Sequence, residues 1–174
     1  MIKSLLTIFI FISSWTVAQE NKNDWKTLKS ADFSIEYPSD WELNESRQMG
    51  TSFFLFSPLE SEQDNFKENI NLIVQDLSGY DLDLAEYSEI SENEIKRLIT
   101  KAIIIQSEPI KMENQTFHQM IYSGTQGTLN LKYYQRYYIK SNKAYVLTFT
   151  CEENKFDVFK KVGETILNSF QFKQ

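Results

Sequence analysis

Hydrophobic and polar residues alternate along much of this chain, and a period of two is the pattern of half-buried β-strands. The segment FSIEY at residues 33–37 alternates in this way and ends at Pro38, which cannot donate to a strand ladder. Later segments are separated by short polar or glycine-containing turns, as antiparallel hairpins are. We therefore expect strands at residues 33–37, 41–43, 51–56, 70–74, 103–112 with a break at Pro109, 116–123, 129–139 and 144–151.

Two other segments have the three-and-four spacing of amphipathic helices. In the first, Asp83 and Glu86 have the N-cap and N3 spacing of a capping box, and the helical face extends to Ala102. The second begins near Lys155, with Asn154 as its expected N-cap. Its apolar stripe consists of Phe156, Phe159, Val162, Ile166, Leu167 and Phe170. The order of strands, helix, strands and helix predicts an α+β fold with a mainly antiparallel sheet.

The start of the chain has the order of a secretory signal peptide. Lys3 provides the positive end, residues 5–12 form a short apolar run, and Thr16 and Ala18 place small side chains before Gln19. We expect cleavage between Ala18 and Gln19 and export to the periplasm or out of the cell. An uncleaved membrane anchor is the alternative, but the apolar run is shorter than the roughly 20 residues that a span needs. The expected division is a signal peptide at 1–18, a polar leader at 19–28 and a single domain at 29–174.

The charge balance of the chain limits its partners. It carries 24 acidic and 18 basic residues, for a formal charge of −6. Phosphate binding needs a cluster of Lys and Arg, so this balance argues against nucleic acid and against adhesion to anionic lipid. We expect no transmembrane span in the mature chain, because no second apolar segment of spanning length follows. The length allows a sizeable core, so we expect a monomer that folds without a disulfide, a metal or another cofactor.

Cys151 and His118 are the single residues of their types, and each has a structural explanation. Cys151 alternates with Leu147 and Phe149, which predicts a buried apolar thiol. His118 could act as a base or a ligand, but without a second His or a Cys cluster a structural role on its strand is the simpler interpretation. A pair of carboxylates for hydrolysis leaves no sequence signature, so a small hydrolase of the carboxylate type stays open.

The most distinctive segment is residues 132–140, where cations and phenols are interleaved. Strand alternation places Tyr134, Arg136 and Tyr138 on one face, which could stack on a ligand or bind an acidic partner. An amphipathic strand whose Lys and Arg stems cover aromatic surface is the structural alternative. Burying Arg136 unpaired would be costly, so it should either reach solvent or meet a carboxylate. We expect it to reach solvent near one edge of the sheet, and these three residues are the candidate partner-binding face.

Three segments resemble the PsbP-like superfamily, which includes PsbP, DcrB and Ran-binding Mog type domains. They are the opening FSIEYPSDW at residues 33–41, the middle helix at 84–98, and the closing strand and amphipathic helix at 144–170. The resemblance implies an antiparallel sheet of about six strands with helices packed on both faces, and a non-enzymatic binding or assembly role. Members bind unrelated partners, so the fold does not give the function. We expect Trp41, which follows the break at Pro38, to be buried and structural.

Together these observations predict an exported accessory domain that binds a protein or envelope component and is not an enzyme. Two alternatives remain: a small hydrolase of the carboxylate type and a small-ligand carrier. A deep pocket that holds two carboxyls with perturbed pKa values would favour the hydrolase. A closed apolar cavity would favour the carrier.

Overall fold

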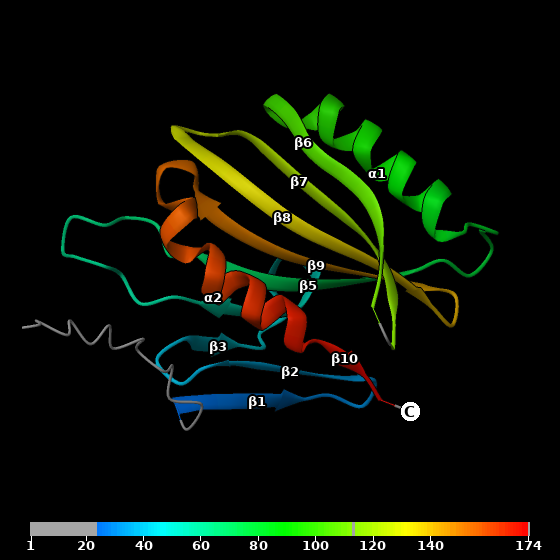
Figure 1. The fold of residues 1–174 in the computed structure, drawn as a ribbon, viewed down its shortest axis with the longest axis horizontal. Coiled ribbons are helices and arrows are strands. Elements are labelled where there is room, and N and C mark those ends of the chain that lie inside the picture. The colour runs from blue at the N-terminus through cyan, green and yellow to red at the C-terminus, as the bar shows by residue number, and fades with distance from the viewer. Residues whose placement is uncertain (1–23, 113, 174) are drawn as a thin grey trace, which may run out of the picture.

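The computed structural model describes residues 24–112 and 114–173, so the expected signal peptide and the cleavage site between Ala18 and Gln19 lie outside the described residues. Within them the chain forms ten strands and two α-helices (Figure 1). The strands are β1 (Trp25–Lys29), β2 (Phe33–Pro38), β3 (Glu42–Asn44), β4 (Thr51–Phe56), β5 (Asn69–Asp76), β6 (Thr100–Lys111), β7 (Thr116–Gln126), β8 (Leu129–Lys140), β9 (Lys143–Glu152) and β10 (Gln171–Phe172). The helices are α1 (Leu84–Leu98) and α2 (Phe156–Ser169), and short 3-10 helices span Gln48–Gly50 and Glu153–Lys155.

The strands form two antiparallel sheets, which confirms the expected α+β fold with mainly antiparallel pairing. The large sheet has seven strands in the order β3-β4-β5-β9-β8-β7-β6, and the small sheet has three in the order β1-β2-β10. The expected single sheet of about six strands therefore differs from the seven and three observed. Helix α1 packs on one face of the large sheet, whereas α2 and the small sheet share the other face (Figure 1). None of the helices in the described part of the chain is long and apolar enough to cross a membrane.

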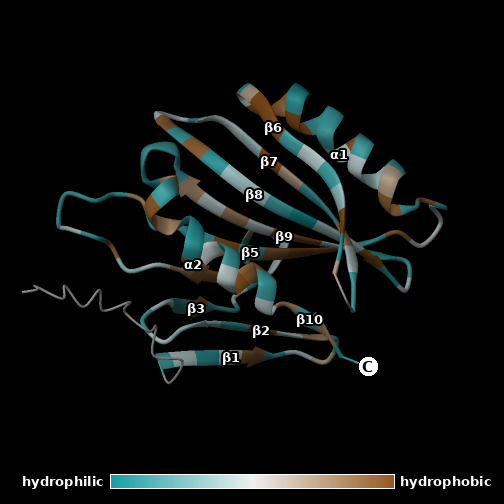
Figure 2. Cartoon of the chain, viewed as in Figure 1, coloured by the Kyte–Doolittle hydropathy of each residue, from teal (hydrophilic) through white to brown (hydrophobic). Residues whose placement is uncertain are grey.

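Strand alternation determines which residues reach each face. On β8, Tyr133 and Tyr137 belong to the core under α1, and Tyr134 and Tyr138 belong to the core under α2. Figure 2 shows the same pattern as hydrophobic and hydrophilic segments that succeed one another along the strands and both helices. The middle strand β9 is buried along nearly all its length because both of its faces are covered.

The first helix begins where the sequence predicts and ends earlier. The Asp83 carboxylate accepts a hydrogen bond from the Glu86 amide at 2.9 Å, and the Glu86 carboxylate accepts one from the Asp83 amide at 3.0 Å. This reciprocal pair confirms the capping box. The expected helical face to Ala102 is wrong at its end, because the backbone is already extended at Ile99 and Ala102 lies in β6.

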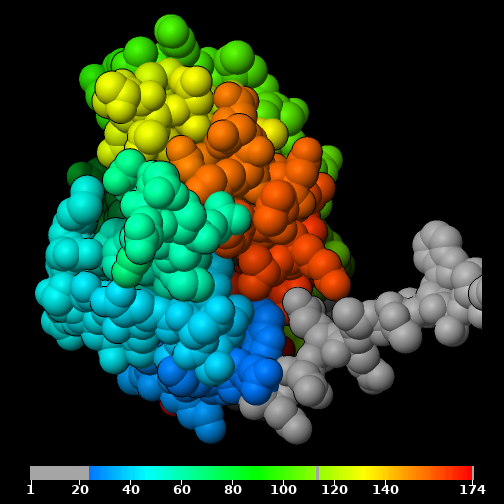
Figure 3. All heavy atoms as spheres, turned by 90° about the vertical axis from the view of Figure 1, so that its left-hand side faces the viewer, coloured from blue at the N-terminus to red at the C-terminus, as the bar shows by residue number. Residues whose placement is uncertain are grey.

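The second helix has the expected apolar stripe but not the expected cap. Asn154 lies in a 3-10 turn, and Lys155 occupies the N-cap position without a side-chain capping bond. The Lys155 ammonium instead forms ion pairs with Glu60 at 2.9 Å, Asp64 at 3.1 Å and Glu152 at 3.1 Å. These contacts hold the polar loop at residues 57–68 against the start of α2, where the loop lies beside the helix in Figure 3.

Three details of the strands differ from the sequence expectation. The last residues of the expected leader at 19–28 belong to β1, which pairs with β2. The short β10 also pairs with β2 and closes the small sheet. Strand β6 continues through Pro109 instead of breaking there, because β6 is an edge strand and a proline on an edge need not donate a hydrogen bond to a neighbour.

Candidate functional site

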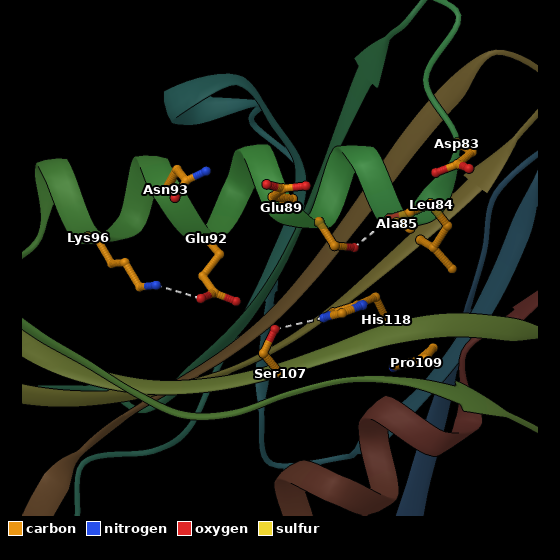
Figure 4. Close-up of a pocket in the computed structure, with 11 residues that line it drawn as sticks. Asp83, Leu84, Ala85, Glu89, Glu92, Asn93, Lys96, Ser107, Pro109 and His118 are labelled. Carbon is orange, nitrogen blue, oxygen red and sulfur yellow. Dashed lines mark hydrogen bonds and ion pairs between the residues drawn. The ribbon is translucent and has the colours of Figure 1, made fainter.

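A groove of about 680 Å³ lies between α1 and the outer strands β6 and β7 (Figure 4). Leu84, Ala85 and Glu92 line it from the helix, and Ser107 and His118 line it from the strands. Figure 4 shows Glu92 pointing from α1 toward the strands, with Ser107 and His118 on the opposite wall. The groove therefore combines a small apolar surface at the start of α1 with polar side chains from three separate elements.

The groove exists because α1 contacts the sheet through few large side chains. Tyr87 packs edge-on against Tyr137 with ring centroids 5.8 Å apart, and Ile95 is buried two turns later. Ser88 is also buried, and its hydroxyl donates to the Leu84 carbonyl at 2.6 Å within the helix. A serine is too small to fill the space above the outer strands, so the helix covers this part of the sheet only in part.

A chain of polar contacts crosses the groove. Ser107 Oγ and His118 Nε2 share a hydrogen bond of 2.9 Å, and Lys96 Nζ pairs with Glu92 at 2.7 Å. The Lys96 ammonium, followed by the Ser107 hydroxyl, lowers the pKa of the Glu92 carboxyl. Burial lowers the pKa of His118, while Glu92 and Glu108 act against this shift. The imidazole is therefore neutral at pH 7 and Glu92 is ionised.

This arrangement suits recognition better than nucleophilic catalysis. Ser107 and His118 are at the distance of a nucleophile and its base. In a catalytic triad, however, the acid forms a hydrogen bond to the imidazole and orients it, whereas Glu92 interacts with Lys96 and the Ser107 hydroxyl and affects His118 only through its charge. A general acid also needs a raised pKa, and that of Glu92 is lowered. The groove can offer a ligand hydrogen bonds and a charged rim around an apolar surface.

The three residues of the candidate partner-binding face lie elsewhere, on the side covered by α2. They share one face of β8 as expected, but Tyr134 is 5%, Arg136 3% and Tyr138 1% exposed. The expectation that Arg136 reaches solvent is wrong, because α2 crosses this part of the sheet and Asn168 of that helix accepts a hydrogen bond from Arg136 Nη2 at 2.6 Å. The alternative partner, a carboxylate, is not found for Arg136 among the described residues either.

Two structural expectations are confirmed. Trp41 is 5% exposed and belongs to the core under α2 and the small sheet. Cys151 is fully buried on the same side as Leu147 and Phe149. Burial, together with the nearby Glu68 carboxylate, raises the pKa of the Cys151 thiol. A thiol in this state is a poor nucleophile, as the sequence interpretation requires.

Sequence reasoning considered His118 but did not place it in a groove with Glu92 and Ser107. The reason is that the groove joins a helix to two strands, and no spacing along the chain encodes that contact. One signal was available: Ser88 and Ser91 lie next to Tyr87 on the inward side of the predicted helix. Small polar residues on an inward side indicate a helix that does not pack closely along its whole length.

Comparisons with known proteins agree with the fold. Residues 12–172 match the sequence model of the family described as PsbP-like protein. Cyanobacterial PsbP (CyanoP) from Synechocystis sp. PCC 6803 is similar in structure, with a TM-score of 0.63 and 14% identity over 86% of this chain and 93% of its own. No curated protein matches this chain in sequence.

Two further solved structures have the same fold. LpqN, involved in cell envelope biogenesis of Mycobacterium tuberculosis, has a TM-score of 0.61 and 11% identity over 86% of this chain and 91% of its own. PA94 from Pseudomonas aeruginosa, a protein of unknown function, has a TM-score of 0.60 and 11% identity over 83% of this chain and 94% of its own. At these identities the structures show the fold alone. The family match, which spans nearly the whole chain, shows that this chain belongs to the PsbP-like protein family.

Proposed function

We propose that this chain is an exported accessory domain that binds a protein or envelope component in the groove between α1 and strands β6 and β7, without catalysing a reaction. The observation that carries the proposal is the groove itself. It is open to solvent, and it presents Leu84 and Ala85 beside the charged Glu92 and Lys96. An apolar surface within a charged rim is the usual composition of a recognition site.

The family and its relatives support this proposal. The family model matches residues 12–172, and LpqN is described as involved in cell envelope biogenesis. An envelope role agrees with the signal peptide that residues 1–18 predict. N-terminal sequencing of the exported protein should then begin at Gln19, and a retained Met1 would contradict export by this route.

The two other functions have weaker support. A hydrolase of the carboxylate type requires a carboxyl whose pKa is raised, and in the groove the pKa of Glu92 is lowered. A small-ligand carrier requires a closed apolar cavity, whereas the groove is open and has charged residues on its rim. Binding of a larger partner fits the open shape.

The experiment is cross-linked affinity capture from the native envelope with three forms of the protein. Ala85→Arg puts a long charged side chain into the groove, while Ile90→Arg places the same side chain on the same helix at an exposed position outside it. We expect Ala85→Arg to lose the specific partner and Ile90→Arg to retain it, with both variants folded by circular dichroism. Equal capture by the two variants would show that the groove is not the binding site.

A further inference from the structure

The groove between α1 and strands β6 and β7 has an acidic lining. Its charged side chains are three carboxylates and one ammonium, those of Asp83, Glu89, Glu92 and Lys96. Because His118 is neutral at pH 7, the described residues of the lining carry a formal charge of −2. A groove lined mainly by one sign of charge concentrates ligands of the opposite sign. The groove should therefore attract positively charged groups.

The three carboxylates differ in how far the fold already neutralises them. Glu92 pairs with Lys96 at 2.7 Å. Asp83 accepts the capping hydrogen bond from the Glu86 amide and thus helps to begin α1. Glu89 is exposed and forms no ion pair among the described residues. Glu89 is therefore the carboxylate of the groove that a cation can approach without displacing a contact of the fold.

The groove also has an apolar end next to these charges. Leu84 and Ala85 line it from α1 and Pro109 lines it from β6, and Figure 4 shows Leu84 and Pro109 at the end away from Lys96. Ala85 and Glu89 are one helical turn apart, which is about 6 Å along the axis. Side chains two residues apart in an extended chain point to the same side at about 6–7 Å. An extended segment can thus cover the apolar end with one side chain and reach Glu89 with another.

We propose that the groove binds an extended basic segment of a partner protein, in which an apolar side chain and a Lys or Arg lie two residues apart. The inference rests on the proposed function and names the chemistry of the partner. The apolar side chain packs against Leu84, Ala85 and Pro109, and the cation pairs with Glu89. The formal charge of −6 on the whole chain attracts a basic partner from a distance. A small polyamine would match the charge but leave the apolar end uncovered.

The test is calorimetric titration of the folded protein, at constant ionic strength, with short peptides blocked at both ends. The probe is acetyl-Lys-Thr-Leu-Thr-Lys-amide, which has a lysine two residues from the leucine in both chain directions and threonines that favour an extended backbone. We expect it to bind at least about tenfold more tightly than the same peptide with glutamine for both lysines or with serine for leucine. The peptide with glutamate for both lysines should not bind, and the polyamine cadaverine should bind at least about tenfold more weakly than the probe.

The outcomes separate this inference from the proposed function. No binding of the lysine peptide at millimolar concentration would overturn the inference, and equal binding of cadaverine would overturn the assignment to a polypeptide. If the glutamine peptide bound as well as the lysine peptide, and Ala85→Arg but not Ile90→Arg abolished both, the groove would remain the partner site and only its preference for cations would be wrong. If the lysine peptide bound equally to Ala85→Arg and Ile90→Arg, its site would lie outside the groove, contrary to both proposals.

Charge reversal locates the bound cation. Glu89→Lys should weaken the lysine peptide at least about tenfold and make the glutamate peptide the tighter ligand, because like charges repel across an interface. Glu94→Lys is the matched control, since Glu94 is exposed on the same helix but outside the groove and the variant changes the net charge equally. It should change the affinity for the lysine peptide by less than about threefold, because salt screens distant charges. Equal weakening by the two variants would show long-range attraction alone and overturn Glu89 as the cation site.

Discussion

On the α2 side of the large sheet, aromatic rings fill the space up to the covering layer, whereas on the α1 side small and polar residues leave an open groove. The Phe170 ring on the α2 side lies within 5.4 Å, between centroids, of the Phe33, Tyr138 and Phe172 rings. On the α1 side the inward surface of the helix includes the buried Ser88. The difference indicates that the core under α2 contributes more to the stability of the domain than the layer under α1 does.

A close approach of α2 to the sheet makes the same point. Gly163 of α2 faces the Phe149 ring, and a Cβ added at that glycine would lie 2.7 Å from the ring. The helix can only approach so closely because the residue has no side chain. On the other face, α1 rests on Tyr87 and Ile95. Contact through a few large residues leaves a groove along α1, whereas α2 lies directly on the sheet at Gly163.

The largest expected loss of stability is on the α2 side. Trp41→Ala should lower the free energy of unfolding by about 3–5 kcal/mol, because it removes a buried indole from the larger core. Leu84→Ala, at the half-buried groove wall, should lower it by only about 1 kcal/mol. Urea unfolding of both variants measures the difference. Similar losses in the two variants would mean that the two faces contribute equally, contrary to the comparison.

An intermediate loss of stability is expected where the helices contact the sheet. Gly163→Ala should lower the free energy of unfolding by about 1–2 kcal/mol, since overpacking against Phe149 exceeds the gain of about 1 kcal/mol in helix propensity. Ser88→Ala on α1 should change it by less than about 0.5 kcal/mol, because the lost hydroxyl bonds only within its own helix. Thermal melts of both variants measure this difference. If Gly163→Ala raised the melting temperature, the prediction would be wrong, and the Phe149 ring would have moved aside with little loss of free energy.

The local patterns were sufficient to predict most elements of the fold. Alternation assigned Tyr134 and Tyr138 to one face of a strand, and the spacing of Asp83 and Glu86 located the start of α1 correctly. The small sheet was missed because β1 and β10 are short and are held by pairing with the distant β2. A strand of two to five residues has little signal of its own when its partner is remote in the sequence.

The sites were harder to predict because each depends on which element covers which face. The sequence placed Arg136 on the correct face, but only the path of α2 decides that Asn168 lies above it. In the same way, Ser107 and His118 face a groove only because α1 lies over this part of β6 and β7. Alternation gives the side to which a residue points, whereas exposure depends on non-local packing.

The smallest expected effects concern pH, and the two faces should respond with opposite sign. His118, on the α1 side, has a pKa lowered by burial from its ordinary value of 6.5. As the pH falls below 6.5, the unfolded chain therefore takes up the proton first, and the stability decreases. Glu68, beside Cys151 on the α2 side, has a pKa raised by burial from its ordinary value of 4.5, although Lys155 acts against this shift. The folded chain holds that proton above pH 4.5 while the unfolded chain releases it, so the stability decreases as the pH rises through this window.

Two variants separate these contributions. His118→Gln should remove the loss of stability that acid causes below pH 6.5, and it should leave the stability at pH 8 almost unchanged, where the imidazole is neutral in both states. Glu68→Gln should raise the free energy of unfolding at neutral pH, because no buried carboxyl then has to hold a proton or lose its water. It should also reduce the decrease in the free energy of unfolding above pH 4.5. The free energy of unfolding measured by urea between pH 4.5 and 8 gives both slopes. If both variants changed the slope of stability against pH in the same direction, the prediction that His118 and Glu68 act with opposite sign would be wrong.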